Sequence, residues 1–202
     1  MKTRSHVLVA VVAFVSLGAG FLIAPSGSSA PGTTDYRGPL QKLADAIRGN
    51  NNAEIKRLAE ELAGKTEVAG VMNTLERRDR AGKKMVFGVG KKPGAINPDG
   101  IEVKIQNMSR RPQPQKTIDR ESDDLVEMAY RTAAVAEVAK IKLPEEEGKK
   151  KIKDWVDWCE AMRKSAIELA EAAKAKDPTR VKNAAAKLNS SCNDCHKVFK
   201  DT

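Results

Sequence analysis

Apolar residues recur every three or four positions through most of the chain, which is the spacing that places them on one face of an α-helix. In the last such stretch the spacings are 4, 3, 4, 3 and 4, over Val181, Ala185, Leu188, Cys192, Cys195 and Phe199. Asp177 and Pro178 come before this seam, as a helix cap and a first helical residue. We predict a closing helix that starts there and buries the seam.

Three more stretches have the same period. One helix is predicted from about Glu145 to Lys174 and another from about Ile118 to Ile141. A third stripe, over 53–76, is weakened by two glycines and reads as one helix or two; a short helix is expected near 40–47. Four main helices with short links between the last three predict an all-α fold, an antiparallel four-helix bundle.

Residues 77–116 break this period with five glycines and four prolines. The segment contains eleven Lys or Arg and three acids, so it carries almost all of the positive charge of the chain, which is +9 overall. We interpret it as a basic insert, open to three readings: a solvated loop, a docking face for an acidic partner, or a site of attraction to anionic lipid or polymer. A short strand or one helical turn is expected around Val103 and Ile105.

The first thirty residues are typical of a secretory signal. A basic start is followed by an apolar run from Val7 to Ala24 and by small residues up to Ala30. The run is also just long enough to span a membrane, so an uncleaved anchor stays open. We expect residues 1–30 to be a signal peptide or anchor and residues 31–202 to form one domain. The predicted location is the periplasm, with membrane attachment only if the segment is retained.

The main chemical signal is Cys192-Asn193-Asp194-Cys195-His196. C-x-x-C-H is the attachment motif of haem c, in which two thiols bond the porphyrin and the histidine bonds the iron. The C-x-x-C pair could also be half of a structural zinc site, but such a site needs four Cys or His ligands. A thioredoxin-like pair would need a βαβ setting. The remaining thiol, Cys159, lies on a predicted buried stripe and is expected to be a small hydrophobe rather than a reactive thiol.

A haem motif on the last helix of a four-helix bundle resembles the class II c-type cytochromes, the cytochrome c′ group. The likeness is closest from Cys192 to Lys200, where Phe199 and Lys200 continue the motif as family members often do. The resemblance implies one covalent haem c on Cys192 and Cys195, with His196 as the proximal iron ligand. It places Lys200 near the haem edge and leaves a homodimer open.

The resemblance leaves the sixth iron ligand undecided, since the family includes both methionine-ligated electron carriers and gas-binding members with an open position. Met72 is the best-placed candidate and Met128 the second, while Met85 and Met108 lie in the insert. The only other histidine, His6, lies in the N-terminal segment. We expect a monohaem electron carrier with a redox partner protein that could be acidic, not an enzyme and not a nucleic-acid binder. Binding of NO or CO is the alternative.

Overall fold

The computed structural model describes residues 34–78, 85–145 and 151–199. Within these residues the secondary structure is helical, apart from one isolated bridge between Arg77 and Gly100. The predicted signal or anchor over residues 1–30 lies outside them. None of the helices in the described part of the chain combines the length and apolar character needed to cross a membrane.

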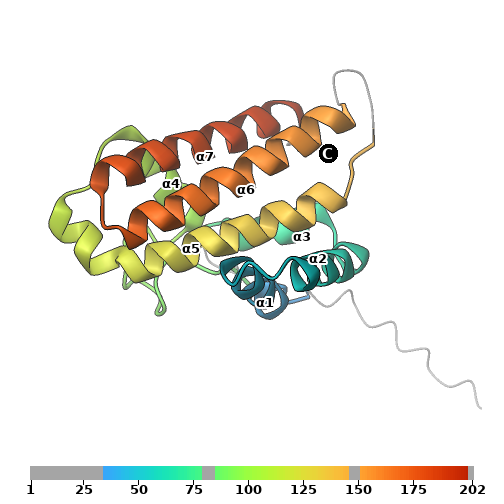
Figure 1. Ribbon diagram of the computed structural model, residues 1–202, viewed down its shortest axis with the longest axis horizontal. Coiled ribbons are helices and arrows are strands. Elements are labelled where there is room, and N and C mark those ends of the chain that lie inside the picture. The colour runs from blue at the N-terminus through green and yellow to red at the C-terminus, as the bar shows by residue number, and fades with distance from the viewer. Residues whose placement is uncertain (1–33, 79–84, 146–150, 200–202) are drawn as a thin grey trace, which may run out of the picture. The chain divides into compact units, whose positions relative to one another are not determined.

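Three long helices form the body of the fold: α5 (Gln115–Ile141), α6 (Ile152–Lys174) and α7 (Pro178–Phe199). Each runs antiparallel to the next, and α6 packs against both α5 and α7 (Figure 1). The predicted stripes are the buried ones. The residues of α6 below 7% exposure include Trp155, Cys159, Met162, Ala166, Leu169 and Ala173.

The N-terminal helices pack on the outer side of α5. They are α1 (Arg37–Arg48) and α2 (Asn52–Lys65), followed by the short α3 (Val68–Met72) and a 3₁₀ turn, η1 (Asn73–Leu75). Asn50 adopts a positive φ of 52° in the turn between α1 and α2, and the Asn51 side chain accepts a hydrogen bond from the Glu54 backbone N–H. The stripe over 53–76 is therefore a long helix that ends at Lys65, followed by a shorter one.

The basic insert, for which a solvated loop was one of three readings, contains a folded element. Residues Ile101–Arg110 form α4, a helix of ten residues rather than one turn, and it packs against α7. Its spacing of four and then three between Ile101, Ile105 and Met108 buries all three side chains. Gly and Pro residues concealed this helix, because they occupy the loop before it and the link after it but not the helix itself.

A carboxylate organises the loop before α4. Asp99 accepts hydrogen bonds from the backbone N–H groups of Val89 and Gly94, both at 3.0 Å, and lies 3.4 Å from the Arg78 guanidinium. The Asp99 carboxylate thus accepts the hydrogen bonds that two backbone N–H groups of this glycine-rich loop could otherwise donate to a bound anion. Gly94 has a positive φ of 74°, a conformation that glycine adopts without a Cβ clash.

A buried ion pair joins α4 to α5. The Lys104 Nζ and a Glu121 carboxylate oxygen are 2.6 Å apart, and the two side chains are 5% and 6% exposed. Burial alone would raise the pKa of Glu121, but hydrogen bonds from Lys104 and Arg120 outweigh it and hold the pKa below the usual 4.5. The stabilisation is therefore complete above pH 4.5 and is lost as the pH falls through the lowered pKa of the folded state.

The prediction of an all-α bundle is confirmed. The described residues contain seven α-helices rather than four main ones, because the first predicted helix divides after Lys65 and because α1 and α4 add to the set. Helix α5 starts at Gln115, three residues before the predicted Ile118. Helix α6 starts at Ile152, seven residues after the predicted Glu145.

Replacing Glu121 by Ala should lower the free energy of unfolding by about 3 kcal/mol, because it leaves the Lys104 ammonium buried without its partner. The double variant Lys104→Met/Glu121→Leu should recover to within about 1 kcal/mol of wild type, since no buried charge remains. Denaturant unfolding measures both. Lys56→Met is the control, because its pair with Glu60 is exposed and should contribute less than about 0.5 kcal/mol. Equal losses in all three variants would contradict the assignment.

Candidate haem site

The register of α7 sets the direction of the motif. Asp177 caps the helix, with a carboxylate oxygen that accepts hydrogen bonds from the Thr179 and Arg180 backbone N–H groups at 2.9 Å. Pro178 fits the first helical position, where its missing N–H removes no hydrogen bond. From this start the predicted seam turns inward, and Val181, Ala185 and Leu188 are fully buried.

The two motif thiols follow on the same seam, and both are half-buried. Cys192 packs against the main hydrophobic core, whereas Cys195 packs against a smaller cluster of Ala139, Trp155, Cys159 and Phe199. We call these four residues the end cluster. The thiols thus lie where the main core meets the end cluster, on the inner side of α7.

Aromatic side chains dominate the end cluster. The Trp155 and Phe199 rings meet edge to face with centroids 5.1 Å apart, and Trp158 packs on Phe199 in the same way at 5.9 Å. The Trp155 indole donates a hydrogen bond to the Ala139 carbonyl at 2.7 Å, which ties α6 to α5. Trp158 did not figure in the sequence prediction, although it stands three residues after Trp155 on the same helix.

Burial suppresses ionisation of all three thiols. It raises the pKa of Cys192 to about 12, with a contribution from Glu102 on α4, and the pKa of Cys195 to about 11. Burial and the neighbouring Cys195 raise the pKa of Cys159 to about 12. Catalytic and redox-active cysteines need a lowered pKa instead. The environment therefore opposes a thioredoxin-like role for the pair, and Cys159 is the buried apolar residue that was expected.

His196 stands four residues after Cys192 on α7 and is half-buried. Its imidazole makes no hydrogen bond or ion pair to the described residues, which leaves its ring nitrogens available to a ligand. Those residues also contain no group of three or more His, Cys, Asp or Glu side chains placed to hold a bare metal ion. A haem iron needs no such group, because the porphyrin supplies four ligands, and this donor set of two thiols and one imidazole fits haem c.

Met72 ends α3 and is half-buried. It packs against both the main core, which Cys192 also borders, and the end cluster, which Cys195 also borders. Met108 and Met128 are instead fully buried within the main core, and Met85 lies in the loop before α4. Of the methionines considered as iron ligands, Met72 is therefore the one that packs against the end cluster, which Cys195 also borders. Lys200 lies outside the described residues.

Comparison with known families supplies an independent observation. Residues 149–200 match the family model described as Cytochrome C′. The C-terminal pair of helices is therefore similar to that of the cytochrome C′ family, as the resemblance implied. The match covers α6, α7 and the motif, and such proteins are haem c cytochromes that in general carry electrons or bind gases. No curated protein and no solved structure gave a significant match to the chain.

The thiols supply a test of the site. In the haem-loaded protein we expect one alkylatable thiol per chain, and only after unfolding, because Cys192 and Cys195 are consumed as thioethers and Cys159 is 3% exposed. Mass spectrometry after alkylation with and without denaturant measures this. Cys159→Ala is the control and should show no reactive thiol in either condition. Three reactive thiols in the denatured wild type would exclude covalent attachment.

Proposed function

We propose that this chain is an exported monohaem c-type cytochrome whose function is electron transfer. The observation that supports this most strongly is the placement of C-x-x-C-H on the inner side of α7, beside the end cluster, within the segment that matches the cytochrome c′ family. Haem c, when bound, supplies a one-electron iron couple. The protein sets the potential through the axial ligands, the burial and the local charge.

The chain's own residues have separable roles in this proposal. The thiols of Cys192 and Cys195 would hold the haem covalently through thioether bonds to its vinyl groups, and His196 would bind its iron. Trp155 and Phe199 would exclude water from the inner side of α7 at the motif. Such burial favours the less charged oxidation state of a redox centre.

We propose Met72 as the sixth ligand, on the distal side. The supporting observation is its contact with both clusters that border the two motif thiols. A thioether at this position would give a six-coordinate iron suited to electron transfer. An open sixth position would suit gas binding instead, and the spectrum decides between the two.

Attachment chemistry gives the first test. Wild-type protein from a strain that matures c-type cytochromes should carry one haem that survives denaturation, seen as haem staining on a denaturing gel and as a mass increase of one haem. Cys192→Ala/Cys195→Ala should lose it, because no thioether can form. His196→Ala should keep part of the covalent haem but lose the normal ferrous spectrum, since only the iron bond is removed. Covalent haem in the double cysteine variant would refute the assignment.

The distal ligand is tested by absorption spectroscopy. Ferric wild type should show the weak red charge-transfer band of a methionine–iron bond, and Met72→Leu should lose it and gain CO binding in the ferrous state. Met128→Leu is the matched control, because it makes the same change within the main core and should leave the band unchanged. A wild-type spectrum that is already high-spin and shifts with CO would replace electron transfer with gas binding as the function.

A further inference from the structure

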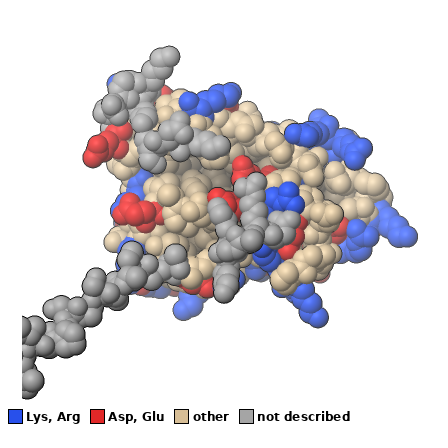
Figure 2. Space-filling model, turned by 180° about the vertical axis from the view of Figure 1, so that it is seen from behind, with Lys and Arg blue, Asp and Glu red and all other residues tan. Residues whose placement is uncertain are grey.

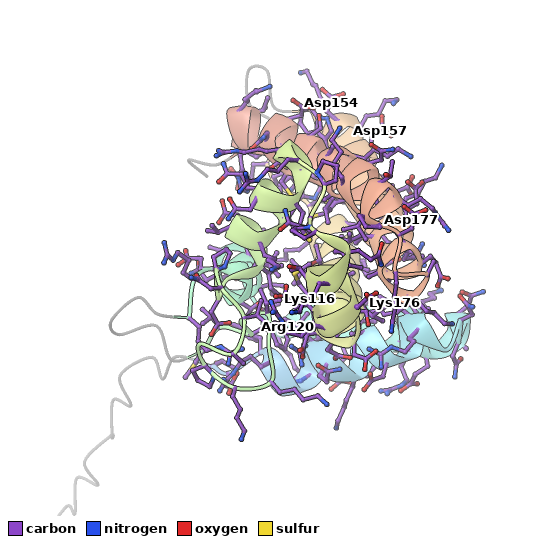
Figure 3. The ribbon with its side chains drawn as sticks, turned by 90° about the vertical axis from the view of Figure 1, so that its left-hand side faces the viewer. Lys116, Arg120, Asp154, Asp157, Lys176 and Asp177 are labelled. Atoms are coloured by element: carbon purple, nitrogen blue, oxygen red, sulfur yellow. The ribbon has the colours of Figure 1, made fainter. Side chains whose placement is uncertain are left out.

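One end of the bundle gathers exposed cations from three segments: the end of α4, the start of α5 and the turn between α6 and α7. We call this set the basic end; its members are Arg110, Arg111, Lys116, Lys176 and Arg180. The Gln115 side chain donates a hydrogen bond to the Lys176 carbonyl at 2.9 Å, which holds the start of α5 against the turn. Figure 3 looks onto this end, with Lys116 and Lys176 labelled, and Figure 2 shows Lys and Arg spread over it at the right of the view.

The cations of the basic end have no ion-pair partner within the described part of the chain. Some exposed cations elsewhere are paired, such as Arg57 with Glu54 and Glu61, whereas others, such as Lys42 and Lys164, stand singly rather than as a cluster. The nearby Asp177 is engaged as the cap of α7. A second acid, Asp119, accepts a hydrogen bond from the Gln115 side chain at 3.0 Å. The five cations of the basic end therefore outnumber these two neighbouring carboxylates.

The fold also neutralises other cations of the basic insert. Arg78 pairs with Asp99, and Lys104 pairs with Glu121, all within the structure. Part of the excess positive charge of residues 77–116 therefore lies at the basic end, because Arg110, Arg111 and Lys116 belong to both.

The basic end lies far from the motif. Cys192 is fourteen residues after Pro178 on α7, which corresponds to about 20 Å along a helix. At the motif end, Lys197 pairs with Asp194 at 2.8 Å and Lys153 pairs with Asp157. A negatively charged surface would therefore attract the end of the bundle that does not carry the motif.

We propose that the basic end docks this protein on an anionic phospholipid surface and leaves the motif end free for a redox partner. The core of a protein–protein interface is typically apolar, whereas an anionic leaflet attracts clustered Lys and Arg by charge. The large exposed hydrophobic side chains of the described residues, Ile141 and Leu143, are both at the C-terminal end of α5, away from the basic end. The predicted N-terminal signal or anchor would bring the chain to a membrane-bounded compartment.

Vesicle binding of the haem-loaded protein, as isolated from cells, tests the proposal. Co-sedimentation is compared between pure phosphatidylcholine vesicles and vesicles with about one third phosphatidylglycerol, so that any binding through a retained apolar segment appears equally in both. The test variant is Arg110→Glu/Lys116→Glu/Arg180→Glu. The matched control is Lys42→Glu/Lys56→Glu/Lys164→Glu, with the same charge change on exposed sites of α1, α2 and the middle of α6.

We expect wild type and control to prefer the anionic vesicles, and the test variant to lose that preference by about tenfold or more. The preference should also weaken as salt rises from about 50 to about 500 mM, because the Debye length shortens. Equal loss in test and control variants would show a net-charge effect and overturn the basic end as a site. Binding to immobilised polyglutamate through these residues, without preference for anionic vesicles, would also overturn the proposal and indicate an acidic protein partner instead. The haem spectrum of each variant is recorded as well. An unaltered spectrum shows that a loss of vesicle binding does not come from damage to the haem site on which the proposed electron transfer depends.

Discussion

The packing of α7 against α6 is the constraint on which the rest of this structure depends. Asp177 starts α7 at a fixed residue, and the seam that follows buries Val181, Ala185 and Leu188 against the bundle. Because an α-helix turns by a constant angle, burial of these residues also places Cys192 on the inner side. The chemistry of the motif is thus a consequence of helix register, and a shift of one residue would turn the thiols away from the core.

Two parts of the fold surround the motif. The end cluster supplies aromatic, water-excluding surface, and its edge-to-face contacts through Phe199 connect the last turn of α7 to α6. On the other side, α4 packs along α7 and brings Glu102 close enough to affect the Cys192 thiol. The insert therefore contributes directly to the environment of the motif, which is a larger role than a surface loop would have.

Charged side chains are paired in some parts of the fold and unpaired in others. Ion pairs within the fold neutralise Arg78 and Lys104, whereas the cations of the basic end have no ion-pair partner among the described residues. The two ends of α7 consequently differ, with paired charges beside the motif and unpaired cations at the helix start. The proposed docking would orient the protein by its basic end and leave the motif end accessible, as the proposed electron transfer requires.

The sequence by itself determined the all-α class, the seams of the three long helices and the haem motif, because each rests on short-range spacing that survives in any packing. It did not reveal α4, whose short stripe stands between glycines and prolines, nor the pairing of Lys104 with Glu121, since that contact joins residues seventeen positions apart. Only the tertiary structure decided which methionine packs against both hydrophobic clusters. It also decided which cations of the insert are paired within the fold and which lie at the basic end. Those properties depend on how helices meet in space, and periodicity within one helix carries no information about that.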